Sequence, residues 1–376
     1  MENPHTFIDL FAGAGGLSMG LEQAGFSPCF VNEIVPEYCA TYQANHDIPN
    51  DRYFVGDINV LNEHFDEYAH LMQGATLVCG GPPCQGFSMA NRQRIIDDPR
   101  NQLYKAYLTF LSKVRPMFFI MENVKGMANK MGEIRQNFSE YLGYEYLFDF
   151  ELFKAQDYGV PQNRERLIFI GNRLGIEPLR IFEEIHRNRR TAFVLRDALI
   201  GLPHLDVKAE KGKTDVENEQ SGFTVRDFTY EENEFYHFIN GDKVISKLYN
   251  HKNRYNNPRD IEIFRRLPQG ANSLHESIAD IMPYTRRNNI FKDKYYKLNE
   301  KQICRTITAH MKYDCNMYIH PWESRGLSPR EAARIQTFPD DYVFTGTQNS
   351  WYAQIGNAVP VKLAKAIGEG IMSFLR

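Results

Sequence analysis

Short apolar runs alternate with amphipathic stretches from Thr6 to about Gly171. Several of the runs are apolar on both faces, as in strands buried within a parallel sheet; they read TFIDLF, PCFVNE, YFVGD, TLVCGG, MFFIMEN and RLIFIGN. Stretches with helical spacing lie between them, for example at 17–24, 38–45 and 103–114. This alternation predicts an α/β fold with a doubly wound, mostly parallel, Rossmann-like sheet, in which ligands bind at the carboxyl ends of the strands.

The regular alternation breaks down from about Arg173 to Arg325, where polar stretches and Asn/Pro punctuation dominate. Helical spacing then returns. Ser328 to Glu331 has the pattern of a capping box, and 361–375 reads as an amphipathic helix. We therefore predict a first domain over 1–185, a smaller irregular domain over 186–325, and a return to the first domain over 326–376.

The composition is that of a soluble globular protein, with 43% hydrophobic and 24% charged residues. The longest apolar run, 117–121, is far shorter than a membrane span, and the first ten residues do not resemble a signal peptide. The six cysteines form neither a disulfide framework nor a CxxC pair. We expect a cytoplasmic protein that binds neither a membrane nor a metal ion.

The net charge of −3 hides an uneven distribution. Residues 243–312 contain 15 Lys and Arg against 6 Asp and Glu, a local charge of +9, whereas residues 206–242 carry −6. A basic block within an acidic protein is a candidate contact surface for a phosphate backbone, although a solvated basic surface explains it equally well.

A glycine turn follows the first apolar run, in the sequence DLFAGAGGLS of residues 9–18. Glycines let a backbone approach a ligand, and the N-terminus of the next helix favours an anionic group. The turn lacks the Gly-Lys-Ser/Thr of a phosphate-binding loop, and it departs from the dinucleotide fingerprint at Ser18. Glu33 and Asp57 close the next two strands and are suited to a ribose and an adenine amino group. The residues indicate an adenosine-containing cofactor, either NAD or S-adenosylmethionine.

Reactive side chains follow the later strands. Cys84 lies beyond the fourth strand in GGPPCQGFS, where two prolines fix the backbone, and is a candidate nucleophile. The polar stretch after it, to Arg100, is a candidate closing loop. Glu122 ends a very apolar strand, a costly position unless the carboxyl is paired or functional. Arg164 and Arg166, two apart at the start of another strand, are expected on one face and within reach of substrate oxygens.

Taken in order, these segments resemble the DNA (cytosine-5) methyltransferases of bacteria and phages. The resemblance covers most of the chain outside roughly 173–300 and rests on six blocks: DLFAGAGGLS, GGPPCQGFS, MENV, QNRER, LSPREAARIQTFPDDY and IGNAVPV. Some blocks are weak singly, but PPCQGFS, ENV, QNRER and GNAVP in this order are highly specific. The second domain would then be the target-recognition domain.

The resemblance implies a role for each matching residue. Cys84 would attack carbon 6 of cytosine, Glu122 would serve ring nitrogen 3, and Arg166, with Arg164 nearby, would hold the base. The implied contacts to S-adenosylmethionine are Phe11, Gly13, Gly15, Leu17, Glu33, Ile34, Asp57, Ile58, Pro83, Leu103, Asn357 and Val359. The expected contacts to DNA are Gln85, Ser88, Arg100, Arg265, Arg266, Arg286, Arg287 and Thr306.

The implied reaction is methylation of carbon 5 of a cytosine flipped out of a specific double-stranded DNA sequence. We expect the enzyme to act as a monomer and to be the modification partner of a restriction system. Three alternatives remain open from the residues: a tRNA methyltransferase with the same catalytic set, an NAD-dependent dehydrogenase, and an inactive DNA-binding relative. The interval of about 160 residues between QNRER and SPREA favours DNA over tRNA, and Cys84 and Glu122 argue against the other two.

Overall fold

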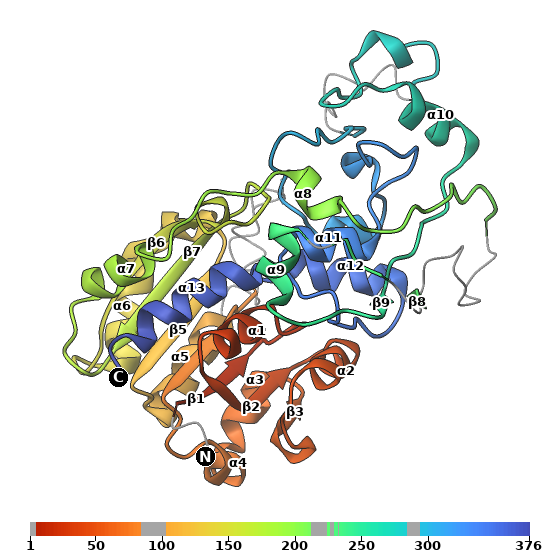
Figure 1. Cartoon of the computed structure of the whole chain (residues 1–376). Coiled ribbons are helices and arrows are strands. Elements are labelled where there is room, and N and C mark those ends of the chain that lie inside the picture. The colour runs from red at the N-terminus through yellow and green to blue at the C-terminus, as the bar shows by residue number, and fades with distance from the viewer. Residues whose placement is uncertain (1–4, 84–102, 212–223, 226–228, 232, 284–293) are drawn as a thin grey trace. The chain divides into compact units, whose positions relative to one another are not determined.

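The computed structural model describes residues 5–83, 103–211, 224–225, 229–231, 233–283 and 294–376. Contacts along the chain divide it into two compact units. Unit 1 comprises Met1–Gly159, Arg164–Thr191 and Ala358–Arg376, and unit 2 comprises Val160–Asn163 and Ala192–Asn357. The elements of each unit are labelled in Figure 1.

Unit 1 is built on a seven-stranded sheet with the order β3-β2-β1-β4-β5-β7-β6. Strands β1 to β5 are parallel, whereas β7 runs antiparallel to both β5 and β6. The strands are β1 (Thr6–Leu10), β2 (Ser27–Glu33), β3 (Tyr53–Val55), β4 (Leu77–Gly80), β5 (Phe118–Asn123), β6 (Leu147–Lys154) and β7 (Glu165–Asn172). The predicted α/β fold with a mostly parallel sheet is confirmed.

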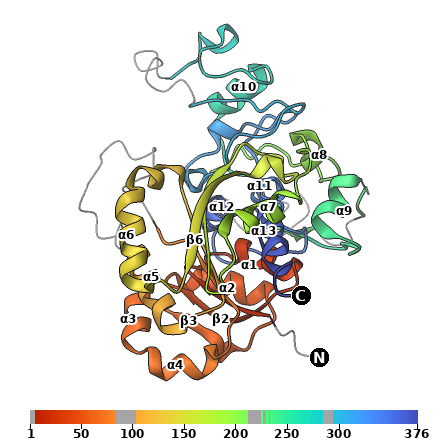
Figure 2. The same ribbon diagram turned by 90° about the vertical axis from the view of Figure 1, so that its left-hand side faces the viewer.

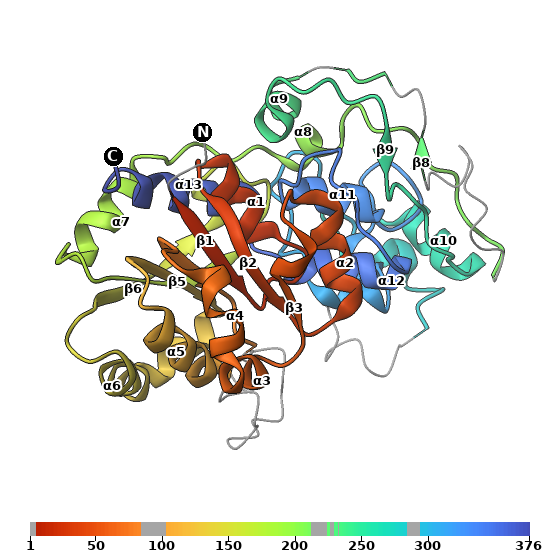
Figure 3. The ribbon, with the colours of Figure 1, turned by 90° about the horizontal axis from the view of Figure 1, so that it is seen from below.

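Helices cover both faces of this sheet, as Figure 3 shows from below. One face carries α1 (Gly16–Gln23), α7 (Pro178–His186) and α13 (Val361–Met372), which pack on one another. The other carries α3 (Ile58–Glu63), α4 (Phe65–Met72), α5 (Leu103–Val114) and α6 (Met131–Leu142), visible in Figure 2, and an extensive apolar core lies under them. Helix α2 (Pro36–Asn45) follows β2. Burying both faces explains why the strands read as continuous apolar runs.

Two glycines bring the last helix of unit 1 against the first. A Cβ placed on Gly20 would lie 2.4 Å from the Cβ of Ala364 and 2.5 Å from the carbonyl oxygen of Val361. A Cβ on Gly368 would lie 2.7 Å from that of Ala24. The C-terminal helix α13 therefore packs on α1 by a close contact that larger residues would prevent.

Unit 2 has little regular structure. Its elements are α8 (Leu195–Leu199), β8 (Thr224–Val225), α9 (Glu234–Asn240), β9 (Leu248–Tyr249), α10 (Pro258–Arg266), α11 (Pro329–Ile335), α12 (Gln348–Asn357) and the short 3-10 helices η6 (Glu276–Ile278), η7 (Ala309–Lys312) and η8 (Asn316–Tyr318). The predicted irregular domain of 186–325 differs from this unit at both ends: residues 186–191 belong to unit 1, and residues 326–357 belong to unit 2, so that the chain returns to unit 1 only at Ala358.

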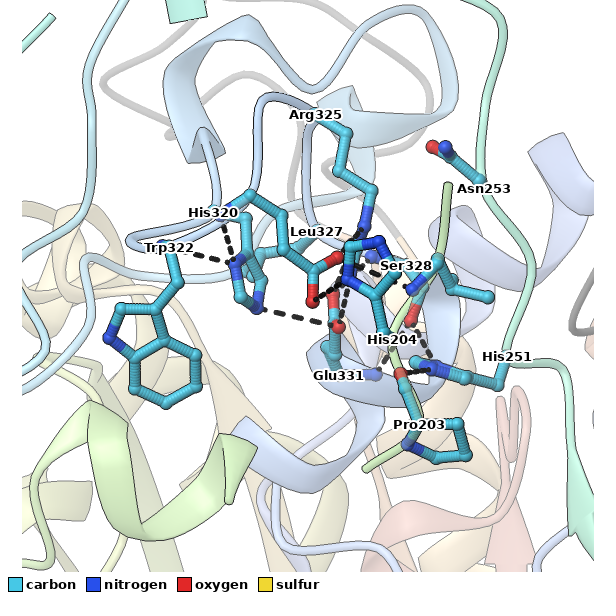
Figure 4. Close-up of polar contacts among 12 residues, drawn as sticks. Pro203, His204, His251, Asn253, His320, Trp322, Arg325, Leu327, Ser328 and Glu331 are labelled. Carbon is cyan, nitrogen blue, oxygen red and sulfur yellow. Dashed lines mark hydrogen bonds and ion pairs between the residues drawn. The ribbon is translucent and has the colours of Figure 1, made fainter. Parts of the chain in front are cut away.

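Buried polar side chains around α11 form a cluster joined by hydrogen bonds and ion pairs (Figure 4). Arg325 donates to both oxygens of Glu331 at 2.8 and 2.7 Å, and the backbone amide of Ser328 donates to the same carboxylate at 2.7 Å. The predicted capping box at Ser328 is confirmed. His251 contacts the Ser328 hydroxyl at 2.9 Å and the carbonyl of Pro203 at 2.8 Å. Hydrogen bonds among distant segments thus hold this part of unit 2.

Candidate functional site

The glycine turn at the end of β1 leaves its backbone open toward the carboxyl edge of the sheet. Phe11, Gly13 and Gly15 have positive φ angles of 57°, 56° and 78°. A Cβ on Gly13 would meet no atom of the described residues within 4 Å, so the space beside it is open within this part of the chain. Gly15 is the N-cap of α1, whose first amides point out of the helix toward any group above the turn. The turn is suited to contact a ligand with its main chain.

Glu33 braces this turn from the neighbouring strand. Its Oε2 accepts a hydrogen bond from the amide of Gly13 at 2.7 Å, and its Oε1 accepts one from the amide of Val35 at 2.8 Å. Burial raises the pKa of this carboxyl, while the backbone donors lower it. Each carboxylate oxygen has two lone-pair sites, so Glu33 can still accept from a hydroxyl of a ligand.

The next residues along the edge differ in exposure. Ile34 is 60% exposed, an unusual state for a large aliphatic side chain directly after a buried strand. Asp57 caps α3 by accepting from the amide of Asn59 at 2.8 Å; β3 ends at Val55, two residues earlier than predicted. The side chain of Ile58 is buried in the core, so only its main chain is available to a cofactor.

The segment that leads to Cys84 is fixed against β5. The side-chain amide of Asn123 donates to the carbonyl of Pro82 at 3.1 Å. A Cβ on Gly81 would lie 2.9 Å from Oε2 of Glu122, so a side chain at this position would collide with the carboxylate. The chain therefore passes directly beside Glu122, three residues before Cys84. The sequence pattern alone gives no signal that Gly81 lies against Glu122.

Glu122 and Arg166 form an ion pair across two strands. Oε1 of Glu122 lies 2.5 Å from Nε of Arg166, and the two side chains are 13% and 15% exposed. Glu122 stands opposite Ile168 in the antiparallel pairing, so that Arg166 is its diagonal neighbour. The predicted acid and one of the predicted arginines thus lie side by side, with Oε2 of the acid facing Gly81.

Arg164 has a different environment. It precedes β7, which begins at Glu165, so the alternation that predicts a shared face with Arg166 does not include it. Its side chain is 1% exposed and donates to the carbonyl of Ala358 at 2.8 Å. Arg164 therefore connects β7 to the segment that precedes α13.

The remaining expected cofactor contacts have mixed environments. Leu17 and Val359 are buried, Leu103 packs against the core, and Pro83 is exposed. Asn357, the last residue of α12, is exposed and belongs to unit 2. Six expected site residues lie outside the described part of the chain: Cys84, Gln85, Ser88, Arg100, Arg286 and Arg287.

Thr306 lies in a hydrogen-bonded part of unit 2. Its hydroxyl donates to the carbonyl of Asn163, and its own carbonyl accepts from the Tyr318 hydroxyl at 2.7 Å. Gln162, next to Asn163, is fully buried and accepts from the amide of Ile307 at 3.1 Å. These bonds fix the start of the QNRER segment.

The basic block is less available than its sequence indicates. Arg265 and Arg266 both pair with Glu262, at 2.5 and 2.6 Å, and Arg266 also pairs with Asp280 at 2.9 Å. Lys297 is buried and donates to a carbonyl within its own unit. Intramolecular partners thus offset part of the +9 charge.

The described residues lack features that mark two other classes of protein. They contain no group of three or more His, Cys, Asp or Glu side chains arranged to bind a metal ion. No helix within these ranges has both the length and the apolar character that a membrane span requires.

Comparison with known proteins places the chain in a family. The family model for C-5 cytosine-specific DNA methylases matches residues 5–373. The chain belongs to this family. Two relatives are the Type II methyltransferase M.PspPI of Psychrobacter sp. (strain TA137), 34% identical over 99% of this chain and 80% of that protein, and the Type II methyltransferase M1.HphI of Haemophilus parahaemolyticus, 32% identical over 98% of this chain and 86% of that protein.

A solved structure extends the similarity to the fold of the methylase. A prophage-encoded protein of E. coli, assigned as a DNA modification methyltransferase, is 27% identical, has a TM-score of 0.75 and is covered to 99%, as is this chain. The resemblance predicted from the six blocks is confirmed. Membership of the family excludes the dehydrogenase, and the tRNA alternative is not favoured, because the relatives are Type II methyltransferases.

Proposed function

We propose that this methylase transfers a methyl group from S-adenosylmethionine to carbon 5 of a cytosine in a specific double-stranded DNA sequence. The observation that carries the proposal is the Glu122–Arg166 ion pair at the carboxyl edge of the sheet, with Gly81 against the acid. Family membership supports the reaction type. The names of the relatives support a role as the modification enzyme of a restriction system.

The chemistry follows from the weak reactivity of cytosine. Carbon 5 becomes nucleophilic when a thiolate, here that of Cys84, bonds to carbon 6 and the ring becomes an enamine. Negative charge then develops on the ring. Glu122, supported by Arg166, is placed to donate a hydrogen bond or a proton to ring nitrogen 3, and Arg166 can hold the carbonyl oxygen. After methylation, a base removes the proton on carbon 5 and the carbon–sulfur bond breaks.

The residues around the glycine turn fit S-adenosylmethionine. The open space beside Gly13 admits a ligand against the main chain, Glu33 can accept from ribose hydroxyls, and exposed Ile34 can cover one face of an adenine ring. Phe11 and Asp57 would complete this set. When bound, the cofactor supplies an electrophilic methyl group on a sulfonium sulfur.

The substrate must leave the double helix, because carbons 5 and 6 of a stacked base are inaccessible to a thiol. Contacts to phosphates would offset the cost of flipping, and unit 2 is the candidate for them, with Thr306 and the exposed arginines of α10. The proposed setting is the cytosol, and the proposed acting form is a monomer.

Labelled methyl transfer to double-stranded DNA and to tRNA tests the function directly. We expect label in DNA alone, and bisulfite sequencing of DNA from expressing cells should place it at one cytosine of a fixed sequence. Label in tRNA and none in DNA would reverse the choice of substrate.

Three variants test the chemistry. Cys84→Ser should abolish transfer and leave cofactor binding intact. Glu122→Gln should lower kcat by about 10²- to 10⁴-fold, the range for a lost general acid. Glu165→Gln is the matched control, since Glu165 pairs at the surface with Lys125 at 3.1 Å and should leave kcat within about twofold. Equal activity of the Glu122 and Glu165 variants would refute the role of Glu122.

A further inference from the structure

A buried chain of polar side chains lies beneath the glycine turn. The hydroxyl of Ser18 donates to Oδ2 of Asp9 at 2.5 Å, and the hydroxyl of Tyr42 donates to Ser18 Oγ at 2.7 Å. Water reaches none of the three, since Asp9 is 1% exposed and the others are fully buried. The chain joins β1, α1 and α2, which lie next in sequence to the proposed cofactor contacts at the glycine turn and at Glu33 and Ile34.

Ser18 is the position at which the turn departs from the dinucleotide fingerprint. A glycine or alanine there lets the helix pack closely against the strand. In this protein the hydroxyl of Ser18 makes the link from α1 to β1 instead, through Asp9. The close glycine contact of α1 is made farther along, where Gly20 meets α13.

Tyr42 connects the same point to the other half of the site. It lies on α2, which begins at Pro36, shortly after Glu33 and Ile34. Glu33 ties the β2 end to Gly13 from the other side of the turn. Two connections, one through Glu33 and one through Ser18, therefore set the spacing between the turn and the β2–α2 segment.

A second link between α1 and α2 lies one helical turn away. His46 stacks on Tyr42 with ring centroids 4.0 Å apart, and its Nδ1 lies 2.5 Å from Oε2 of Glu22. Residues 18 and 22, like 42 and 46, are one turn apart on their helices. The outer link joins the same two segments through the Glu22 carboxylate, whereas the inner link runs through the hydrogen bond from Ser18 to Asp9, so the two links can be compared.

Asp9 also contacts the strand that leads to the nucleophile. It pairs in register with Cys79 of β4, and the Cys79 thiol donates a hydrogen bond to its carboxyl. Cys79 precedes Gly81, which abuts Glu122, by two residues. The Asp9 carboxyl thus accepts hydrogen bonds from Ser18 on α1 and from Cys79 on β4, the strand that leads toward Cys84.

We propose that Asp9, Ser18 and Tyr42 are positioning residues, whose hydrogen bonds fix the glycine turn relative to Glu33 and Ile34 and thereby set the affinity for S-adenosylmethionine without touching it. This inference rests on the proposed cofactor. Loss of the bonds lets the turn shift, which weakens binding, while the Glu122–Arg166 pair stays in place.

The test measures the dissociation constant for S-adenosylmethionine and kcat at saturating cofactor. Ser18→Ala and Tyr42→Phe should weaken binding by about tenfold and about threefold, in line with the loss of a buried hydrogen bond, and leave kcat within about twofold. His46→Phe keeps a ring against Tyr42 but loses the bond to Glu22. It should lower the melting temperature as much as Tyr42→Phe and leave the dissociation constant unchanged.

Two results would overturn the proposal: unchanged affinity in Tyr42→Phe and Asp9→Asn, or equal weakening in His46→Phe and Tyr42→Phe. The second would mean that general loosening of the helices is responsible. If Ser18→Ala fails to fold, the Tyr42 and Asp9 variants still decide the matter. A wild-type protein that binds the cofactor but does not methylate DNA would contradict the proposed function and leave this inference standing.

Discussion

Two buried carboxyl groups, one in each unit, have opposite pKa shifts although each is 1% exposed. Burial raises the pKa of Asp9 to about 7. Hydrogen bonds from the Ser18 hydroxyl and the Cys79 thiol lower this pKa only in part, and the nearby acids Glu33 and Glu22 raise it further. Burial would also raise the pKa of Glu331, but Arg325 holds it well below its usual range. The partner, and not the burial, decides whether the charge is retained.

The two clusters therefore contribute differently to their units. In unit 2, Glu331 faces a fully buried arginine and a backbone amide, so its charge is compensated inside the protein. In unit 1, the donors to Asp9 among the described residues are the neutral Ser18 hydroxyl and Cys79 thiol. A costly carboxyl beneath the glycine turn is consistent with a functional site, where stability is commonly sacrificed.

The largest expected effect comes from removing the cation in unit 2. Arg325→Met leaves Glu331 buried without its partner and should lower the free energy of unfolding of this unit by about 3–5 kcal/mol. Hydrogen exchange of the α11 amides, read by mass spectrometry, measures it. Arg187→Ala, which breaks an exposed pair with Glu184, is the control and should cost less than about 1 kcal/mol. Equal losses in both variants would contradict the comparison.

The pH dependence of unit 1 should show the uncompensated acid. Between pH 4 and 7 the unfolded chain ionises Asp9 while the folded state keeps its proton, so the free energy of unfolding falls as the pH rises, by about 1.4 kcal/mol per pH unit from this group. Asp9→Asn removes this slope. Hydrogen exchange of β1 and α1 across this pH range measures it, and an unaltered slope in the variant would refute the assignment.

Unit 2 should have the opposite dependence, from its histidines. Burial lowers the pKa of His251 to about 4 and that of His320 to about 3, and both remain neutral when folded. The unfolded chain protonates them below about pH 6.5, so stability is lost as the pH falls from there toward 4, by about 1.4 kcal/mol per unit for each histidine.

His320→Asn tests this dependence. Nδ1 of His320 accepts from the amides of Trp322 and Glu323, at 3.2 and 3.1 Å, and the oxygen of an asparagine can replace this acceptor. The variant should lose one histidine's share of the slope, measured by urea unfolding at pH 4.5 to 7. If the free energy of unfolding of unit 2 in the wild type fell as the pH rose, as expected for Asp9 in unit 1, the proposed contrast between the two units would be wrong.

The smallest effect is expected at the surface, where water screens charges. Glu262→Gln removes the carboxylate that Arg265 and Arg266 share, while Arg266 keeps its pair with Asp280, and should steepen the salt dependence of DNA binding. Arg265→Gln should instead reduce the slope by about 1. Binding titrations at several salt concentrations measure both. Identical slopes in the two variants and the wild type would remove α10 from the DNA contacts.

The sequence predicts unit 1 well because its physics is local and periodic. Strands buried on both faces leave continuous apolar runs, and β1 to β5 and β7 lie where those runs occur. The apolar runs do not indicate β6. This strand lies at one edge of the sheet, and its alternation of phenylalanine with acidic residues in LFDFELFK lacks the apolar continuity of the others.

The site is predictable in part. Glu122 and Arg166 are neighbours because Glu122 lies near the end of β5 and Arg166 near the start of β7, which pairs antiparallel with β5. The fate of Arg164 is not predictable, because its partner Ala358 is 194 residues away along the chain. The same holds for the hydrogen bonds of Asp9 and of Glu331. Periodicity indicates which residues are buried but not which polar groups will meet there.

The boundary between the units falls inside one of the six blocks and has a consequence for engineering. Residues 160–163 belong to unit 2, where the amide of Asn163 donates to the carbonyl of Cys304 and the amide of Cys304 donates to the carbonyl of Pro161. Arg164 and Arg166, which follow, belong to unit 1. A chimera that takes 192–357 from another methylase would keep residues 160–163 of this protein, and these residues would then have to pack against the other protein's 192–357. Transplants that also exchange 160–163 should yield folded hybrids more often.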